Sequence, residues 1–217
     1  MSRIFTIFGT NQVKMTISKQ VEEMINTMPK GSVIFIDDFL DKFEYEIARK
    51  ALQRLHNNEQ VMRLSRGVYY KPKESELLGV IKPSAEQIAE AIAKRDKARI
   101  IPTGSYAQYR LGLTTQIPMN VVYLTDGSPR KIQVGNQKIA FKKTSPKNLA
   151  VSHTLTSLII QALKEFGEGE ANSNQLIQIQ AIIEKSNESR KVRENIKYAP
   201  VWIQKVVSNI LKMIDNE

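Results

Sequence analysis

Polar and basic side chains recur at helical spacing in EYEIARKALQRLHNN, residues 44–58, opposite an apolar stripe. Their types can read base edges, because arginine or lysine donates to guanine O6 and N7 and glutamine pairs with adenine. Helices that enter a DNA groove contact bases mainly through their N-terminal half. The candidate contacts are therefore Tyr45, Glu46, Arg49, Lys50 and Gln53, with Arg54 at the flank. Any solvated helix face has the same pattern, so this helix alone leaves both interpretations open.

A second basic element follows the helix directly. Residues 61–71 contain two short β-type runs around Arg66-Gly67, which predicts a hairpin with a cation at its tip. Gly67 suits a turn position that needs a positive φ. A tip that carries Arg66, flanked by Arg63 and Lys71, can lie along phosphates or place a guanidinium in a narrow minor groove.

Alternation along the second run, Val68-Tyr69-Tyr70, predicts that one of its two tyrosines packs inward and the other faces solvent. The outer one is a candidate donor to a phosphate. This makes the hairpin both a structural element and a candidate contact.

The elements of residues 18–76 predict a winged helix-turn-helix. Their order is a helix, a short strand at 31–36, a short helix and turn, the helix 44–58, and then the hairpin. Residues 42–73 hold eight Lys and Arg against three Glu, so the positive charge concentrates where this domain would meet DNA.

The whole chain is basic, with a formal net charge of +10 over 217 residues. That surplus favours a polyanionic partner, although a basic surface kept for solubility has the same sum. Cysteine is absent, which excludes disulfides and thiolate zinc sites, and two histidines make a histidine metal site a poor prospect. We therefore expect neither a metal nor a cofactor. We also expect no membrane contact, because no apolar run nears the ~18 residues of a membrane span. The expected location is the cytoplasm.

Residues 77–149 form a second predicted region of mixed α and β structure. It starts with a helix whose N-terminus has a capping box, with Ser84 as N-cap and Gln87 three residues later. It also contains a basic hairpin at 130–143. The candidate partner contacts on that hairpin are Arg130, Lys131, Lys142 and Lys143. They could extend a DNA footprint, receive an acidic protein, or form the charged outer face of a sheet.

Helical periodicity then predicts three helices in a C-terminal region, residues 150–217, and residues 1–17 form a tail without a clear period. The expected fold class is therefore α+β. It consists of an N-terminal winged helix-turn-helix, a mixed α/β region and C-terminal helices.

Enzymatic chemistry finds little support in these residues. Gly31-Ser32 and Gly104-Ser105 resemble the Gly-Ser pair that opens a nucleotidyltransferase site, but that chemistry also needs carboxylates that hold Mg²⁺. Asp37 and Asp38 are adjacent, so they would face opposite ways on a strand, and Asp126 stands alone in a turn. We expect a protein that is not an enzyme.

Four segments between residues 18 and 150 also carry a family resemblance. They are GSVIFIDDFL, ALQRL, RLSRGVYYKP and PTGSYAQYRLGLTTQIPMNVVYLTDGSPRKI, and VWI at 201–203 adds a fainter match. LGLTTQIP followed by VYLTDG is the most specific part. Together they resemble the AbiE-type family of antitoxins and winged-helix transcriptional regulators.

The resemblance implies a repressor of its own promoter that counteracts a nucleotidyltransferase-like toxin encoded next to it. It implies DNA contacts by Arg49, Lys50, Gln53, Arg63 and Arg66. It assigns the antitoxin role to residues 80–150 and the C-terminal helices.

Two hypotheses of different classes result. The first is a sequence-specific regulator of double-stranded DNA, whose operator would contain paired half-sites about 10 bp apart, or a multiple, if two copies bind. The alternative is a protein-interaction module with a structural winged helix that binds an acidic partner. Exposure of Arg49, Lys50, Arg63 and Arg66 on one surface favours the first, and burial of Arg49 and Lys50 favours the second.

Overall fold

The computed structural model describes residues 16–216 of the chain. Contacts divide the chain into two compact units, with the division between Pro83 and Ser84. The predicted boundary lay after residue 76; the first unit extends further because residues 73–81 form an additional hairpin. The predicted tail, residues 1–17, lies outside the described residues except for its last two, of which Ile17 begins the first helix.

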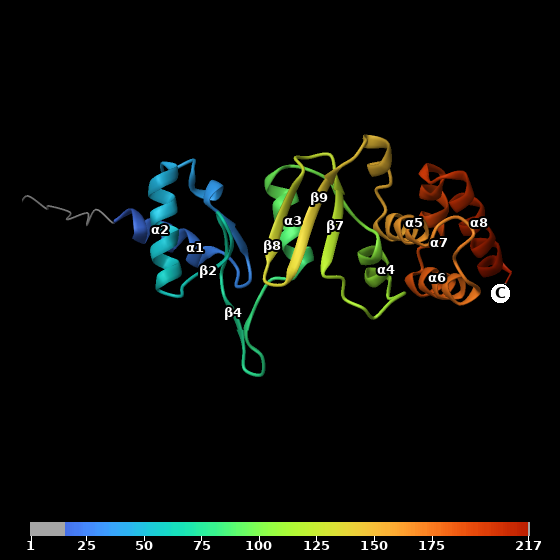
Figure 1. The fold of residues 1–217 in the computed structure, drawn as a ribbon, viewed down its shortest axis with the longest axis horizontal. Helices are drawn as coiled ribbons and strands as arrows, with labels where there is room; N and C mark the ends of the chain where they lie inside the picture. Colours follow the sequence, from blue (N-terminus) through green and yellow to red (C-terminus); the bar gives the residue numbers. More distant parts are fainter. Residues whose placement is uncertain (1–15, 217) are drawn as a thin grey trace, which may run out of the picture. The chain divides into compact units, whose positions relative to one another are not determined.

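From residue 16 onward, where the description begins, the first unit contains three helical segments and two small sheets (Figure 1). The helical segments are α1 (Ile17–Thr27), the 3-10 helix η1 (Ile36–Phe39) and α2 (Tyr45–Asn57). The strands are β1 (Val33–Phe35), β2 (Met62–Ser65), β3 (Val68–Tyr70), β4 (Lys73–Ser75) and β5 (Gly79–Ile81). The first three strands form an antiparallel sheet in the order β1-β3-β2, and β4 pairs with β5.

One apolar core holds α1, α2 and the three-stranded sheet together. Its members, buried at spacings that suit a helix or a strand, include Val21, Ile25, Ile34, Phe39, Ala48, Leu52, Leu55, Val61 and Tyr69. The turn between β2 and β3 has Gly67 at φ +74°, which confirms the predicted need for a glycine there.

Strand β3 corrects one sequence-based expectation. Tyr69 and Tyr70 are both buried, so neither tyrosine is the exposed member of an alternating pair. The reason is position: β3 is the middle strand of its sheet, so its side chains have neighbours from both β1 and β2, and Tyr70 lies in register with Val33 and Met62.

The second unit begins with a four-stranded sheet and three short helical segments. The strands are β6 (Ile100–Thr103), β7 (Asn120–Thr125), β8 (Arg130–Val134) and β9 (Gln137–Lys143), in the order β6-β7-β9-β8. The helical segments are α3 (Ala85–Arg95), α4 (Ser105–Leu111) and the 3-10 helix η2 (Pro146–Leu149). Pairing is antiparallel except between β7 and β9, which run parallel.

Helix α3 covers one face of this sheet and contacts β6 and β9 (Figure 1). The side chains at the centre of that face are buried, among them Val121, Tyr123, Ile139 and Phe141. The predicted cap of α3 is confirmed: Ser84 Oγ accepts from the Gln87 backbone N–H (3.2 Å), and Gln87 Oε1 accepts from the Ser84 N–H (2.9 Å).

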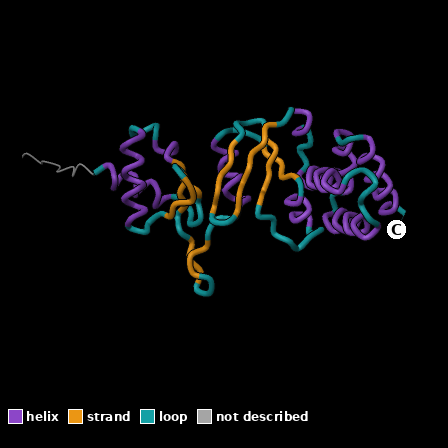
Figure 2. Tube along the Cα trace, viewed as in Figure 1, coloured by secondary structure: helices purple, strands orange, loops and turns teal. Residues whose placement is uncertain are grey.

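The rest of the unit is helical (Figure 2). It consists of α5 (Thr154–Phe166), α6 (Ser173–Ser186), α7 (Ser189–Asn195), the 3-10 helix η3 (Ile196–Tyr198) and α8 (Val201–Asp215). The three predicted helices correspond to α5, α6 and α8, whereas α7 was not predicted. Contacts of α5 with α4 and β6 join these helices to the sheet, so the predicted regions 77–149 and 150–217 share one compact unit from Ser84 onward.

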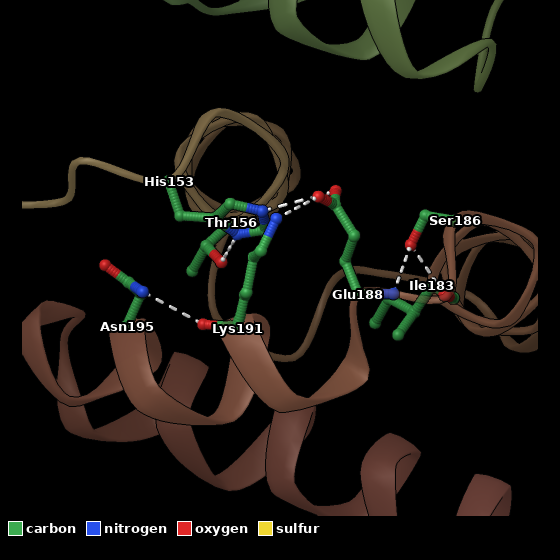
Figure 3. Close-up of polar contacts among 7 residues, drawn as sticks. All are labelled: His153, Thr156, Ile183, Ser186, Glu188, Lys191 and Asn195. Carbon is green, nitrogen blue, oxygen red and sulfur yellow. Dashed lines mark hydrogen bonds and ion pairs between the residues drawn. The ribbon is translucent and has the colours of Figure 1, made fainter.

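A polar cluster joins the start of α5 to the start of α7 (Figure 3). Nδ1 of His153 hydrogen-bonds to Oγ1 of the buried Thr156 (2.8 Å), and Nε2 lies 3.2 Å from Glu188 Oε2. Lys191 Nζ donates to the other carboxylate oxygen of Glu188 (2.9 Å). These contacts fix the turn between α6 and α7 against α5. The described elements as a whole make a mixed α+β fold, as expected.

Candidate nucleic-acid interface

Helix α2 is fixed on one face and open on the other. Ala48, Ala51, Leu52 and Leu55 are at most 3% exposed and anchor it in the core. The residues between them project away from the core because the apolar positions recur every three or four residues. The polar face that the sequence predicts is therefore the accessible face of this helix.

A hollow of about 290 Å³ lies between this face and the β2–β3 turn. The lining residues come from η1, α2, β2, β3 and the turn: Ile36, Tyr45, Glu46, Arg49, Gln53, Arg63, Arg66, Gly67 and Tyr69. Six predicted contacts thus gather around one concave surface, although the helix and the turn are separate in sequence. Lys50 and Arg54 are exposed on α2 but do not line the hollow.

Arg49 is held in a fixed orientation by Glu46, one helical turn earlier. Its Nε donates to both carboxylate oxygens (3.2 and 3.1 Å), and its Nη2 donates to Oε2 (2.8 Å). The hydrogen bond from Arg49 lowers the pKa of Glu46, so the carboxylate stays charged. A guanidinium has a second fork formed by Nη1 and Nη2, and this geometry leaves that fork for another acceptor.

Two further groups of the hollow, Gln53 and Arg63, are positioned by short-range contacts. Gln53 Nε2 donates to Asn57 Oδ1 (3.0 Å), and Arg63 Nε donates to the Ser65 carbonyl (3.2 Å). Tyr45, at the first position of α2, is 47% exposed. Arg66, at the turn, is exposed as the sequence predicts.

With this geometry established, the chain can be compared with known proteins. Residues 20–191 match the sequence model of DUF6088, a family of unknown function. The chain belongs to the DUF6088 family. The match begins within α1 and ends within α7, so it includes α2, the β2–β3 turn and the four-stranded sheet.

Two further comparisons add little to the DUF6088 assignment. No curated protein matches the sequence. The crystal structure of the RV2827C protein from Mycobacterium tuberculosis superposes with a TM-score of 0.47 at 10% identity, over 90% of this chain and 75% of that one. A likeness of that size carries no argument about fold or function.

One residue predicted to contact DNA has a different position in this DUF6088 protein. Lys71 Nζ donates to three backbone carbonyls at the C-terminal end of α1, those of Ile25 (3.1 Å), Asn26 (3.0 Å) and Met28 (2.8 Å). A helix C-terminus attracts cations because its last carbonyls lack partners within the helix. Lys71 therefore stabilises the domain and does not join the hollow.

The residues of the second unit that were predicted to contact a partner lie on two different faces of the sheet. Along β8 and β9 the side chains alternate between two faces, so Lys131 and Lys142 lie opposite Arg130 and Lys143. Arg130 forms an ion pair with Asp96, which follows α3, and it is a structural contact. Lys138 shares the face of Lys131 and Lys142, and the sequence-based selection omitted it.

The Gly-Ser pair at 104–105 has one carboxylate close by. Gly104 adopts φ +65° and ψ −149°, and a Cβ there would lie 3.3 Å from Oε2 of Glu165. Among the described residues of this DUF6088 chain, no three His, Cys, Asp or Glu side chains group in a way that could hold a metal ion. No helix in the same residues combines the length and apolar character that a membrane span requires.

Proposed function

We propose that this protein is a sequence-specific regulator that binds double-stranded DNA through a winged helix-turn-helix in its first unit. The observation that carries the proposal is the hollow between α2 and the β2–β3 turn. Arg49, Arg63 and Arg66 line it from three different elements. Convergence of cations from a helix and a hairpin on one exposed surface suits a helix in the major groove with the hairpin on the neighbouring backbone.

Arg49 would read guanine. Glu46 occupies the Nε side of its guanidinium, so the Nη1–Nη2 fork can donate to O6 and N7 of one base. Holding the side chain in advance reduces the conformational entropy lost on binding. Gln53, on the same face of α2, has the amide that pairs with adenine.

Arg66 would contact the DNA outside the bases that α2 reads. It lies at the tip of a turn that Gly67 makes tight, and it is exposed. From there the guanidinium can bind phosphates or enter a narrow minor groove. Arg63 and the exposed Lys50 and Arg54 would add phosphate contacts that carry affinity without sequence information.

The proposal extends to regulation of a toxin. The resemblance to AbiE-type antitoxins supports a repressor of its own promoter, with residues 84–217 neutralising a nucleotidyltransferase-like partner. The support for this part is the sequence resemblance between residues 18 and 150. The exposure of Arg49 and Lys50 favours DNA over the alternative of a purely structural winged helix that serves a protein-interaction module.

Fluorescence anisotropy tests the proposal, with DNA from the protein's own promoter and a scrambled duplex at two salt concentrations. The wild type should bind the promoter at least ~10³-fold tighter than the scramble. The double variant Arg49→Ala/Arg66→Ala should lose that margin. Arg190→Ala is the matched control, because Arg190 is 92% exposed and lies on α7 in the second unit.

Equal and weak binding of both duplexes, with an affinity that collapses as salt rises, would contradict the proposal. It would mean that the positive charge attracts phosphates without reading sequence.

A further inference from the structure

The tip of the β4–β5 hairpin exposes apolar side chains to an unusual degree. Leu77 is 94% exposed and Leu78 is 79% exposed. Within residues 16–216, the two strands form a two-stranded sheet of their own, and such isolated hairpins are marginal in water. Adjacent exposed leucines at the end of a projecting element are typical of a surface that another surface covers.

The same tip is acidic. Glu74 and Glu76 precede the leucines, and residues 74–80 contain no cation. Glu74 lies opposite Val80 in the antiparallel pairing, so a carboxylate and an apolar side chain share one face of the hairpin. The surface that receives this tip should be both apolar and basic.

The second unit contains a surface of that kind. The face of the four-stranded sheet opposite α3 has a hollow of about 460 Å³ over β7, β8 and β9. The residues around it are Asn120, Val122, Lys131, Ile132, Gln133, Lys138, Ile139 and Ala140. By alternation along the strands, the side chains of Ile132 and Ile139 lie on the α3 side, and the other six lie on the open side. We name this surface the open sheet face. Val122 and Ala140 pair across neighbouring strands at its centre, and Lys142 lies on the same face.

The charge of the open sheet face is uniformly positive. None of the residues that line its hollow is acidic, and residues 128–147 contain six cations and no Asp or Glu. None of the lining residues is aromatic or an arginine, so the hollow has no group on which a base could stack. Aliphatic side chains among lysines suit an acidic, apolar protein segment better than a nucleic acid.

We propose that the β4–β5 tip of a second copy of this chain docks on the open sheet face. Each copy has both surfaces, so a two-fold symmetric dimer would contain the tip–face contact twice and cover both tips and both faces. Leu77 and Leu78 would cover Val122 and Ala140, and Glu74 and Glu76 would meet Lys131 and Lys138. The proposal stands apart from DNA binding, since neither surface includes α2 or the β2–β3 turn.

Sedimentation velocity of the full chain over a range of micromolar concentrations tests the dimer. The wild type should dimerise. The dimer dissociation constant should rise at least about 100-fold in each of two double variants, Leu77→Ser/Leu78→Ser at the tip and Lys131→Glu/Lys138→Glu on the face. Matched controls are Ile177→Ser/Met213→Ser, at exposed apolar positions on α6 and α8, and Lys185→Glu/Lys205→Glu, at exposed lysines. Circular dichroism verifies that each variant is folded.

A charge exchange identifies the two contacting surfaces. Glu74→Lys/Glu76→Lys gives a chain with a basic tip and a basic face, and Lys131→Glu/Lys138→Glu gives an acidic tip and an acidic face. Each variant alone should be monomeric because like charges meet. An equimolar mixture should form a heterodimer, since both of its contacts then join opposite charges.

Three results would overturn the proposal. The first is a wild type that stays monomeric over the whole range. The second is a dimer that survives either the tip or the face substitutions, which would place the interface elsewhere. The third is a charge-exchange mixture that does not associate. Binding of DNA to the open sheet face, weakened by Lys131→Glu/Lys138→Glu in a protein that remains monomeric, would assign that face to nucleic acid instead.

Discussion

At the scale of residues, the central pair is Glu46 and Arg49. On the proposed DNA-binding surface, a carboxylate opposes affinity, because it repels the polyanion. Its contribution is orientation: it fixes the guanidinium through Nε and Nη2, with bonds of 3.1 and 2.8 Å to one carboxylate oxygen. Glu46 should therefore raise specificity at the expense of general affinity.

The variant Glu46→Gln tests this role. It should bind scrambled DNA more tightly, because a negative charge is gone. The margin, meaning the ratio of its affinity for promoter DNA to its affinity for scrambled DNA, should fall about ten-fold because Arg49 loses its fixed orientation. Anisotropy titrations against both duplexes give the ratio. Glu23→Gln removes the same charge from an exposed position on α1 and should leave the margin unchanged. A margin that is preserved in Glu46→Gln would refute the orientation role.

Lys71 gives a second prediction at this scale. The variant Lys71→Met keeps most of the apolar stem but removes the donor to three carbonyls at the end of α1. It should lower the free energy of unfolding by about 1–2 kcal/mol. Urea denaturation measures the change, with Lys50→Met, at an exposed position on α2, as the control. Equal stability of the two variants would contradict the structural role.

Sequence reasoning identified the cations around the hairpin but could not separate their roles. Arg66 was predicted at the tip of the hairpin and Lys71 at its flank, and both residue types are typical of DNA contacts. The carbonyls that bind Lys71 belong to residues 25–28, far back in the chain. Only the tertiary fold brings them together, so no local pattern could have revealed the difference.

At the scale of elements, the β2–β3 turn depends on Gly67. Its φ of +74° is strained for residues with a Cβ, although a Cβ there would meet only Ile36 Cδ1 at an ordinary 3.7 Å. Gly67→Ala should thus lower the free energy of unfolding by about 1 kcal/mol for conformational reasons alone. Gly67→Asn should lose less, because asparagine tolerates this conformation better. Urea denaturation that ranks alanine at or above asparagine would contradict this explanation.

The contact between α5 and α7 predicts a dependence on pH. The hydrogen bond from Lys191, together with the nearby His153, lowers the pKa of Glu188. A lowered carboxyl pKa contributes stability that is present above the ordinary glutamate range and is lost as the pH falls through the folded pKa. The thermal midpoint of the wild type should therefore exceed that of Glu188→Gln at neutral pH, and the difference should shrink in acid.

Lys191→Met removes the same hydrogen bond. The difference between its thermal midpoint and that of the wild type should depend on pH in the same way. Thermal unfolding followed by circular dichroism at several pH values provides both curves. A difference between wild type and Glu188→Gln that stays constant down to acid pH would show that the carboxylate charge contributes nothing.

Periodicity predicted helices α2 and α3 and the β2–β3 and β8–β9 hairpins, each of which has a strong local signature, but it missed the β4–β5 hairpin. It also did not predict which side chains within these elements would be covered. Alternation along β8 and β9 already separates Lys131 from Arg130, yet the ion pair of Arg130 requires knowing that α3 packs on that face. Tyr70 is similar, since its burial depends on β3 being the middle strand.

At the scale of the whole molecule, the sequence indicated the α+β class but not the grouping of its parts. Strand β9 returns to pair with β7 in parallel and leaves β8 at the edge. Both strands of the β8–β9 hairpin have similar patterns, so the choice between them is made by packing. The short helix α7 lacks a broad apolar stripe, since Val192 is its only buried residue, and periodicity could not detect it.

Under the proposed function, the first of the two compact units reads DNA. Nuclear magnetic resonance of the full chain, titrated with the promoter duplex, tests this central claim most directly. The largest amide shifts should lie at residues 45–54 and 63–67, and they should saturate with DNA. Shifts that gather instead at residues 130–143, or that never saturate, would contradict the assignment of α2 and the β2–β3 turn as the DNA-reading surface.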